Sequence, residues 1–310
     1  MPPRPIYTPE SVRVVHRLNY DWTAWLKKEG GGEGRRGGGN AQSALHRDKP
    51  GGGEARLGQG GDGLDRLATG LVPVEARLRG ALEACRDLWT QDGLTLDTWA
   101  FDGSRLQVLV AADPAVSPAF AFHRLKGRLT HALRTGAPHP PIQFRRNVGF
   151  RTLGENTRSV VDAYIGKQAG KSDYVDPRFK QYLGRFTVEN GGELLAQPVT
   201  SGHGRYWYNL HLVIVVQDRR FPMTRGETFR TVRSTCFQIA AKKGHRLASI
   251  SVMPDHVHLS LCGAIEDSPM DIGLAYLNNL AYVLGQNRCW SEEFYVGTFS
   301  EYDLAAIRSD

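Results

Sequence analysis

Two histidines separated by one residue are the first candidates for chemistry in this sequence. His256 and His258 lie in SVMPDHVHLSLCG, residues 251–263, where apolar and polar residues alternate as in a half-buried strand. Positions i and i+2 of a strand leave the same face, so both imidazoles would point the same way. Imidazole nitrogens bind divalent cations. The spacing therefore predicts part of a metal site, and the simpler alternative is a pair of ordinary surface or core histidines.

The residues around the pair resemble a known motif. MPDHVHLSL resembles the HUH motif (histidine, hydrophobic residue, histidine) of HUH endonucleases, in the form found in single-tyrosine transposases of the insertion-sequence and REP-associated kind. YNLHLVIVVQDRR resembles the first strand of that family, and WSEEFYVGTFSE resembles its later strand and turn. The resemblance covers residues 205–310 and implies a DNA transposase whose histidines hold Mg²⁺ or Mn²⁺.

The resemblance also implies a tyrosine nucleophile, followed four residues later by a glutamine that helps to hold the metal. VVDAYIGKQ supplies Tyr164 and Gln168, which share one face of an expected helix. Tyr282 and Gln286 have the same spacing, but they fall in a helix before the last strand, where Tyr282 is expected to pack in the interior. The resemblance thus assigns the nucleophile to Tyr164 and the third metal ligand to Gln168.

The elements that must position these residues occur twice. FRRNVGFRTLGENTRSVVDAY, residues 144–164, aligns without a gap with WSEEFYVGTFSEYDLAAIRSD, residues 290–310. SRLQVLV aligns with DHVHLSL, which puts Arg105 and Gln107 at the places of the two histidines. Further landmarks pair as Thr152 with Thr298 and Glu155 with Glu301. Each copy follows the order β-α-β-β-α-β-α, which is typical of a ferredoxin-like α+β domain.

The repeat predicts the organisation of the whole chain. The expected fold class is α+β, with two tandem ferredoxin-like domains forming a pseudo-dimer, each an antiparallel sheet with helices on one face. The N-terminal domain would span 1–168 and contain a Gly-rich disordered insertion at about 29–63. Residues 169–204 would be a connector, and residues 205–310 would form the C-terminal domain.

The two copies keep complementary parts of the motif. The C-terminal copy has the histidines, but the place of its tyrosine is Asp310, the last residue of the sequence. The N-terminal copy has Tyr164 and Gln168 but no histidine pair. The hypothesis is one composite site between the domains. The alternative is independent decay of both copies, which would leave a catalytically inactive, domesticated transposase that binds DNA by sequence or hairpin.

Composition agrees with a nucleic-acid partner. The 310-residue chain has a formal net charge of +7, and its four cysteines show no metal-binding or disulfide spacing. No apolar run is long enough to span a membrane, so we expect a soluble cytoplasmic protein, bacterial and nucleoid-associated by the resemblance. The expected partner is single-stranded DNA, with a hairpin implied by the resemblance. Candidate DNA contacts are Lys126, Arg128, Arg145, Arg146, Arg219 and Arg220.

Two other enzyme classes deserve comparison. A rolling-circle initiator or relaxase uses the same metal and tyrosine chemistry, but relaxases carry a third histidine upstream of the pair, which SVMPDHVH lacks. A zinc hydrolase is disfavoured because the sequence has no HExxH and no third ligand at the usual spacing.

Overall fold

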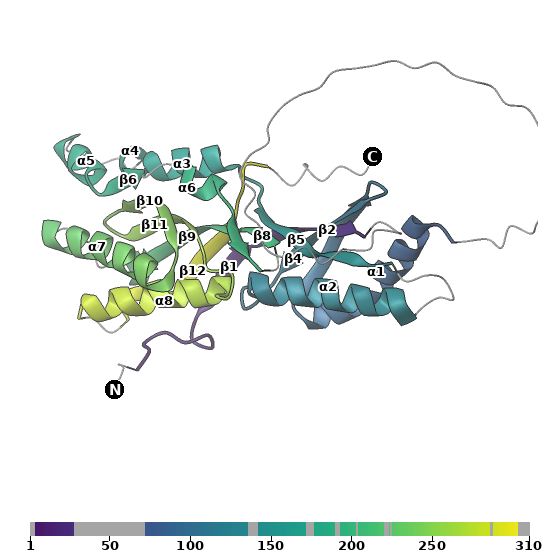
Figure 1. Ribbon diagram of the computed structural model, residues 1–310. Coiled ribbons are helices and arrows are strands. Elements are labelled where there is room, and N and C mark those ends of the chain that lie inside the picture. Colours follow the sequence, from purple (N-terminus) through teal and green to yellow (C-terminus); the bar gives the residue numbers. More distant parts are fainter. Residues whose placement is uncertain are drawn as a thin grey trace, which may run out of the picture.

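The computed structural model describes residues 4–27, 72–135, 142–171, 177–189, 193–202, 204–219, 223, 225–285 and 288–302. The predicted Gly-rich insertion lies outside these residues. The described residues form a mixed α+β fold with two six-stranded sheets lying side by side (Figure 1). This confirms the α+β class expected from the sequence.

The second sheet carries the histidine strand. Its strands, in spatial order, are β1 (Arg13–Arg17), β12 (Trp290–Thr298), β9 (Asn209–Val216), β11 (His256–Cys262), β10 (Arg246–Val252) and β6 (Thr187–Glu189). Helices α7 (Gly226–Lys243) and α8 (Pro269–Val283) pack on one face, and α3 (Arg158–Gly166) packs on β10 and β11 from the other (Figure 1). β10 and β11 are therefore buried on both faces.

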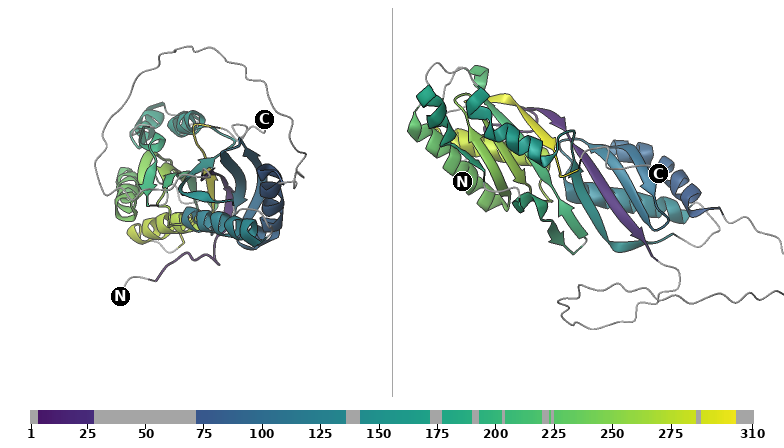
Figure 2. Two further views of the ribbon diagram at one scale, coloured as in Figure 1. Left: turned by 45° about the vertical axis from the view of Figure 1, so that its right-hand side comes forward. Right: turned by 90° about the horizontal axis from the view of Figure 1, so that it is seen from above.

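The first sheet has the strand order β7 (Val199–Ser201), β8 (Gly204–Trp207), β5 (Phe144–Leu153), β2 (Asn19–Leu26), β4 (Arg105–Ala112) and β3 (Leu94–Phe101). Helices α1 (Val74–Gln91) and α2 (Pro118–Thr135) pack on it, on the side that α7 and α8 occupy in the other half (Figures 1 and 2). The remaining short elements are α4 (Gln168–Lys171), α5 (Pro177–Gly184), α6 (Glu193–Ala196) and η1 (Gln217–Arg219).

The strand order of one sheet repeats in the other. β1-β12-β9-β11-β10 corresponds to β8-β5-β2-β4-β3, and the first pair of each series, β1 with β12 and β8 with β5, is parallel. β1 runs through Leu18 into β2, and β8 runs through Tyr208 into β9. Each half therefore contributes one strand to the sheet of the other half. These two strands, β1 and β8, are called the lent strands below. The domain limits expected from the sequence stay a prediction, although β6 and β7 of the expected connector join different sheets.

Two threonines at equivalent places join the sheets. The Thr152 hydroxyl donates to the Phe299 carbonyl at 2.8 Å and accepts the backbone N–H of Asn209 at 3.1 Å. The Thr298 hydroxyl donates to the Leu153 carbonyl and accepts the backbone N–H of Asn19 at 2.9 Å. These bonds satisfy buried backbone groups where the chain leaves one sheet for the other.

Gly154 makes the close crossing at this junction possible. A Cβ atom at this position would lie 2.1 Å from the Thr298 carbonyl oxygen, well inside van der Waals contact. Any larger residue would have to push the ends of β5 and β12 apart.

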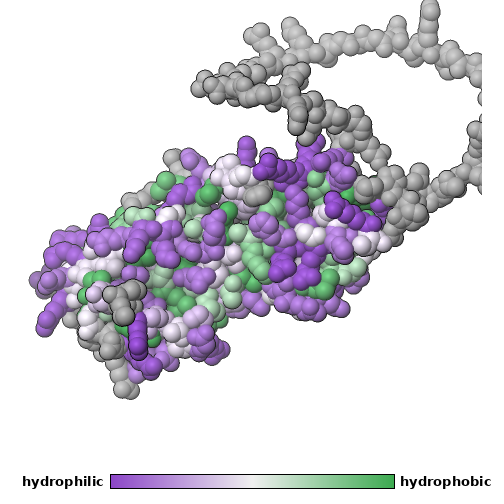
Figure 3. Space-filling view, turned by 60° about the horizontal axis from the view of Figure 1, so that its bottom comes forward, coloured by the Kyte–Doolittle hydropathy of each residue, from purple (hydrophilic) through white to green (hydrophobic). Residues whose placement is uncertain are grey.

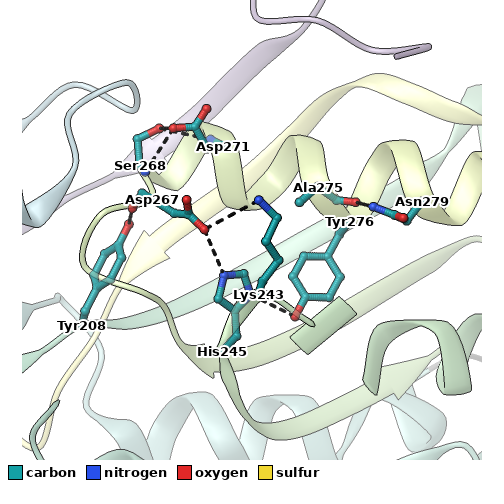
Figure 4. Close-up of polar contacts among 9 residues, drawn as sticks. All are labelled: Tyr208, Lys243, His245, Asp267, Ser268, Asp271, Ala275, Tyr276 and Asn279. Carbon is teal, nitrogen blue, oxygen red and sulfur yellow. Dashed lines mark hydrogen bonds and ion pairs between the residues drawn. The ribbon is translucent and has the colours of Figure 1, made fainter. Parts of the chain in front are cut away.

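Helix α8 is fixed at its beginning by a capping box. The Ser268 hydroxyl accepts the Asp271 backbone N–H at 3.1 Å, the Asp271 carboxylate accepts the Ser268 N–H at 3.2 Å, and Pro269 occupies the first turn (Figure 4). The Tyr208 hydroxyl donates to the Asp267 carbonyl just before it. These contacts hold α8 against the histidine sheet.

The helix-covered side of the molecule mixes hydrophilic residues with smaller hydrophobic areas (Figure 3). Among the described residues, no helix combines the length and the hydropathy needed to span a bilayer.

Candidate functional site

Both histidines lie on β11, at the face that α3 covers. Val257 points the opposite way and is fully buried, as the alternation of the strand predicts. The ring centroids of His256 and His258 are 4.8 Å apart, and His258 is 3% exposed. The pair expected from the sequence therefore shares one face at close range.

Helix α3 comes from the other half of the sequence and crosses the junction to reach this face. Its first backbone N–H, from Arg158, donates to the Ser300 carbonyl at 2.7 Å, and the Arg158 guanidinium pairs with Glu301. Val161 and Ile165, at i and i+4, are buried against the sheet. The Asp162 carboxylate accepts hydrogen bonds from Ser249 and Ser260 on the sheet, and burial raises its pKa.

This docking places Tyr164 beside the histidines. Its ring centroid lies 5.3 Å from that of His258, at a steep angle, and the residue is 42% exposed. Gln168 begins α4, is buried, and donates its side-chain N–H to the Tyr164 carbonyl at 2.8 Å. Tyr164, Gln168, His256 and His258 all line one cavity of about 480 Å³, so the structure brings the four residues together.

The cavity has further lining residues that the sequence argument did not single out. They are Asn156, Val160, Val161, His211, Val213, Val215 and Tyr295, together with the expected DNA contact Arg219. The sequence does hold a signal for His211, because alternate residues of a strand share one face, and His211 alternates with Val213 and Val215. The surrounding residues are otherwise apolar, so the run is typical of a buried strand.

The side-chain contacts prepare His256 to bind a cation. Its Nδ1 lies 2.6 Å from the Asp255 carboxylate, which also pairs with Arg219. The hydrogen bond from His256, more than any other contact, lowers the pKa of Asp255 to about 2. An ionised carboxylate only accepts, so Nδ1 of His256 carries the hydrogen and Nε2 carries the lone pair.

The other expected ligands also fit a divalent cation. Nδ1 of His258 faces Nε2 of His211 at 3.1 Å, so Nε2 is the nitrogen with which His258 would bind. Gln168 uses its amide nitrogen for the Tyr164 carbonyl, which leaves its amide oxygen as the atom that could bind a cation. Two imidazole nitrogens and one amide oxygen are suitable donors for Mn²⁺ or Mg²⁺ with water completing the shell. In the described part of the chain, no three His, Cys, Asp or Glu residues cluster as a metal site.

Burial also controls the charge of the neighbouring imidazole. Desolvation lowers the pKa of His211 to about 4, so this ring is neutral at neutral pH. Burial raises the pKa of the Tyr295 phenol, whose ring lies 5.7 Å from that of His211.

The expected DNA contacts are spread over both halves. Lys126 donates to the Arg145 and Arg146 carbonyls, and Arg128 makes a two-bond ion pair with Asp92, at 2.5 and 2.8 Å. Arg145 and Arg146 are exposed on β5, and Arg219 lines the histidine cavity. Arg220 lies outside the described residues. Contact of any of these residues with DNA stays a prediction.

Tyr282 lies away from the histidines. It lines a different hollow, of about 670 Å³, beside Arg4 and Lys243. Figure 4 draws other residues of this lining, among them Asp271 and Asn279. Tyr282 is 65% exposed, so the expectation that it packs in the interior is wrong. The helix α8 turns its apolar residues toward the sheet and leaves position 282 on the outer face.

The structure thus places a tyrosine-bearing helix, α3, against the strand β11 that carries the two histidines, within a mixed α+β fold. Residues 205–272 match the family model described as IS200-like transposase. This part of the chain is therefore similar to IS200-like transposases, and the family resemblance carried by the MPDHVHLSL stretch is confirmed.

Two solved structures are similar to parts of the chain. A protein of Deinococcus radiodurans R1 with a provisional transposase assignment is 21% identical over 28% of this chain and 75% of its own, with a TM-score of 0.27. A REP-associated tyrosine transposase bound to a REP hairpin is 12% identical over 30% of this chain and 56% of its own, also at 0.27. At these TM-scores neither likeness supports an inference about this chain. No curated protein matches significantly.

Proposed function

We propose that the chain is a DNA transposase-like enzyme that cleaves and rejoins single-stranded DNA at one composite site. The observation that carries the proposal is the single cavity lined by Tyr164 and Gln168 from one half and by His256 and His258 from the other. The IS200-like match of residues 205–272 supports the reaction class. The net charge of +7 suits a polyanionic substrate, and a hairpin-bearing single strand is the substrate that we propose.

His256, His258 and Gln168 would hold a Mg²⁺ or Mn²⁺ ion. When bound, the ion would polarise the scissile phosphate and stabilise the charge that develops on its oxygens. The protein contributes the orientation of the ligands, through Asp255 on His256 and through the Tyr164 carbonyl on Gln168.

Tyr164 would be the nucleophile. Its phenolic oxygen loses a proton and forms a bond to phosphorus, while the bond from phosphorus to the 3′-oxygen breaks and that oxygen takes up a proton. The products are a 5′-phosphotyrosine link and a free 3′-hydroxyl. Because the phosphodiester energy is kept in the link, a 3′-hydroxyl can reverse the reaction and rejoin the strand. Partial exposure of Tyr164 gives a DNA strand access to it.

The proposed architecture is a tandem of two ferredoxin-like units that forms a pseudo-dimer within one chain. The repeated strand order, the two parallel lent strands and the equivalent threonines support it. We propose that the chain acts as a monomer, since both parts of the composite site belong to one polypeptide. A bacterial, nucleoid-associated cytoplasmic location is part of the same proposal.

The direct test is a covalent adduct. Purified protein is incubated with a 5′-labelled and a 3′-labelled hairpin-bearing strand and Mn²⁺, then separated on a denaturing gel. We expect an adduct with the label 3′ of the cut, abolished by Tyr164→Phe and by chelation, and retained in the matched control Tyr282→Phe.

Other outcomes separate the alternatives. An adduct that persists in Tyr164→Phe but disappears in Tyr282→Phe would show that the nucleophile is misassigned. Tight hairpin binding without any adduct in the wild type would identify an inactive DNA-binding protein instead.

A further inference from the structure

The imidazole of His211 is held in one position by its surroundings. His211 lies on β9, where its register partners are Ser260 on β11 and Gly297 on β12. The Tyr295 ring occupies the space over Gly297, because a Cβ atom there would lie 2.2 Å from the Tyr295 hydroxyl. That ring meets His211 edge-on at 5.7 Å, and the Tyr164 ring meets it from another side at 5.9 Å.

His211 also contacts His258. Their rings are nearly parallel, 18° apart with centroids at 5.3 Å, and Nε2 of His211 lies 3.1 Å from Nδ1 of His258. At this distance the two nitrogens share one hydrogen, which one ring donates and the other accepts.

Metal binding requires that His258 be the donor of this pair. A histidine that binds through Nε2 has its lone pair there and its hydrogen on Nδ1. If His258 binds in this way, its Nδ1–H donates to Nε2 of His211, and His211 carries its own hydrogen on Nδ1. The arrangement matches that of His256, whose Nδ1–H donates to Asp255.

We propose that His211 is a positioning residue that fixes the tautomer and ring orientation of His258 for metal binding. The proposal rests on the proposed function, because it concerns the same site. His211 would not touch the metal or the DNA phosphate. Its loss is expected to weaken Mn²⁺ binding by about 10- to 100-fold, the usual effect of removing a hydrogen-bond partner of a metal-binding histidine.

The first test needs no metal. The full-length protein is labelled with ring-¹⁵N histidine, and long-range ¹H–¹⁵N spectra report the tautomer of His258, assigned by the loss of its signals in His258→Gln. We expect the Nδ1–H tautomer in the wild type, a mixture in His211→Phe, which keeps a flat ring but offers no acceptor, and recovery in His211→Gln, whose amide oxygen can accept. An unchanged His258 tautomer in His211→Phe would overturn the proposal.

The second test measures Mn²⁺ binding by electron paramagnetic resonance in the wild type, His211→Phe, His211→Gln and His256→Ala. We expect His211→Phe to weaken binding, His211→Gln to restore most of it, and pulsed spectra to count two coordinated imidazoles in the wild type. Three coordinated imidazoles, falling to two in His211→Phe, would make His211 a ligand and overturn the positioning role.

The two tests fail separately. Wild-type protein that binds no Mn²⁺, or binding that His256→Ala leaves unchanged, would sink the proposed metal site. Unfolding curves and circular dichroism of each variant exclude a general loss of structure. Wild-type Mn²⁺ affinity in a folded His211→Phe, together with loss in His256→Ala, would overturn the role of His211 and leave the metal site standing.

Discussion

Asp21 occupies on β2 the place that His211 occupies on β9. Thr23 on β2 pairs with Gln107, just as Val213 on β9 pairs with His258. Asp21 lies two positions before Thr23, and His211 lies two positions before Val213. Burial raises the pKa of Asp21 to about 6, against opposing contributions from Thr23 and Arg151. The same place thus carries a neutral imidazole in one half and an acid with an elevated pKa in the other.

This raised pKa predicts a pH-dependent stability. An acid whose folded-state pKa exceeds its unfolded-state value contributes stability below about pH 4 that is lost as the pH rises through about 6. We therefore expect the free energy of unfolding of Asp21→Asn, relative to that of the wild type, to rise by about 2 kcal/mol from pH 4 to pH 7.5. Urea unfolding of both proteins at both pH values measures it. A difference between variant and wild type that does not change with pH would contradict this.

Arg128 and Arg145 should separate stability from DNA binding. Arg128 is paired with Asp92, and this contact lowers the pKa of that carboxyl, whereas Arg145 is exposed on β5. We expect Arg128→Ala to lower the free energy of unfolding by about 1–2 kcal/mol with little effect on DNA affinity. Arg145→Ala should leave stability unchanged and reduce the salt dependence of single-strand binding by about one ion. The reverse pattern would place Arg128, rather than Arg145, at the DNA.

At the scale of elements, α3 is the part on which the composite site depends. Ile165 is fully buried between α3 and the sheet, whereas Val160 on the same helix is 50% exposed. We expect Ile165→Ala to lose about 2–4 kcal/mol and to reduce the hydrogen-exchange protection of residues 158–166. Adduct formation should fall in parallel, because Tyr164 leaves the histidines when the helix undocks.

Val160→Ala is the matched control for the exchange measurement and should leave α3 protected. If Ile165→Ala loses protection in α3 but forms adduct at the wild-type rate, Tyr164 does not act from the docked helix. That result would count against the composite site without touching the fold.

The sequence was informative about elements and less so about their neighbours. The alternation around Val257 correctly predicted the common face of the two histidines, and the gap-free alignment correctly paired Thr152 with Thr298 as equivalent positions. Periodicity reports which face of an element is buried, but not what lies against it. The exposure of Tyr282 and the contact between His211 and His258 depend on packing from distant segments, so the pattern missed both.

At the scale of the molecule, the lent strands β1 and β8 could not be read from the sequence. β1 is five residues long, mostly exposed, and pairs with residues about 280 positions away. A short edge strand carries too little alternation to specify its partner. The register is instead fixed by neighbouring contacts, such as the buried Tyr7 hydroxyl, which donates to the Trp290 carbonyl at 2.8 Å.

The lent strands predict that the chain stays assembled when it is cut once. With a protease site placed between Glu189 and Glu193, the first piece keeps β1 and β6 in the second sheet and α3 packed on that sheet. The second piece keeps β7 and β8 in the first sheet. Each piece thus completes the sheet of the other through backbone hydrogen bonds and buried side chains. We expect the cut protein to elute as one species with the mass of a single chain, to separate only in denaturant, and to retain adduct formation. Pieces that separate under native conditions would contradict the proposed contribution of β1 and β8 to the opposite sheets. An uncut protein with twice the mass of one chain would contradict the proposed monomer.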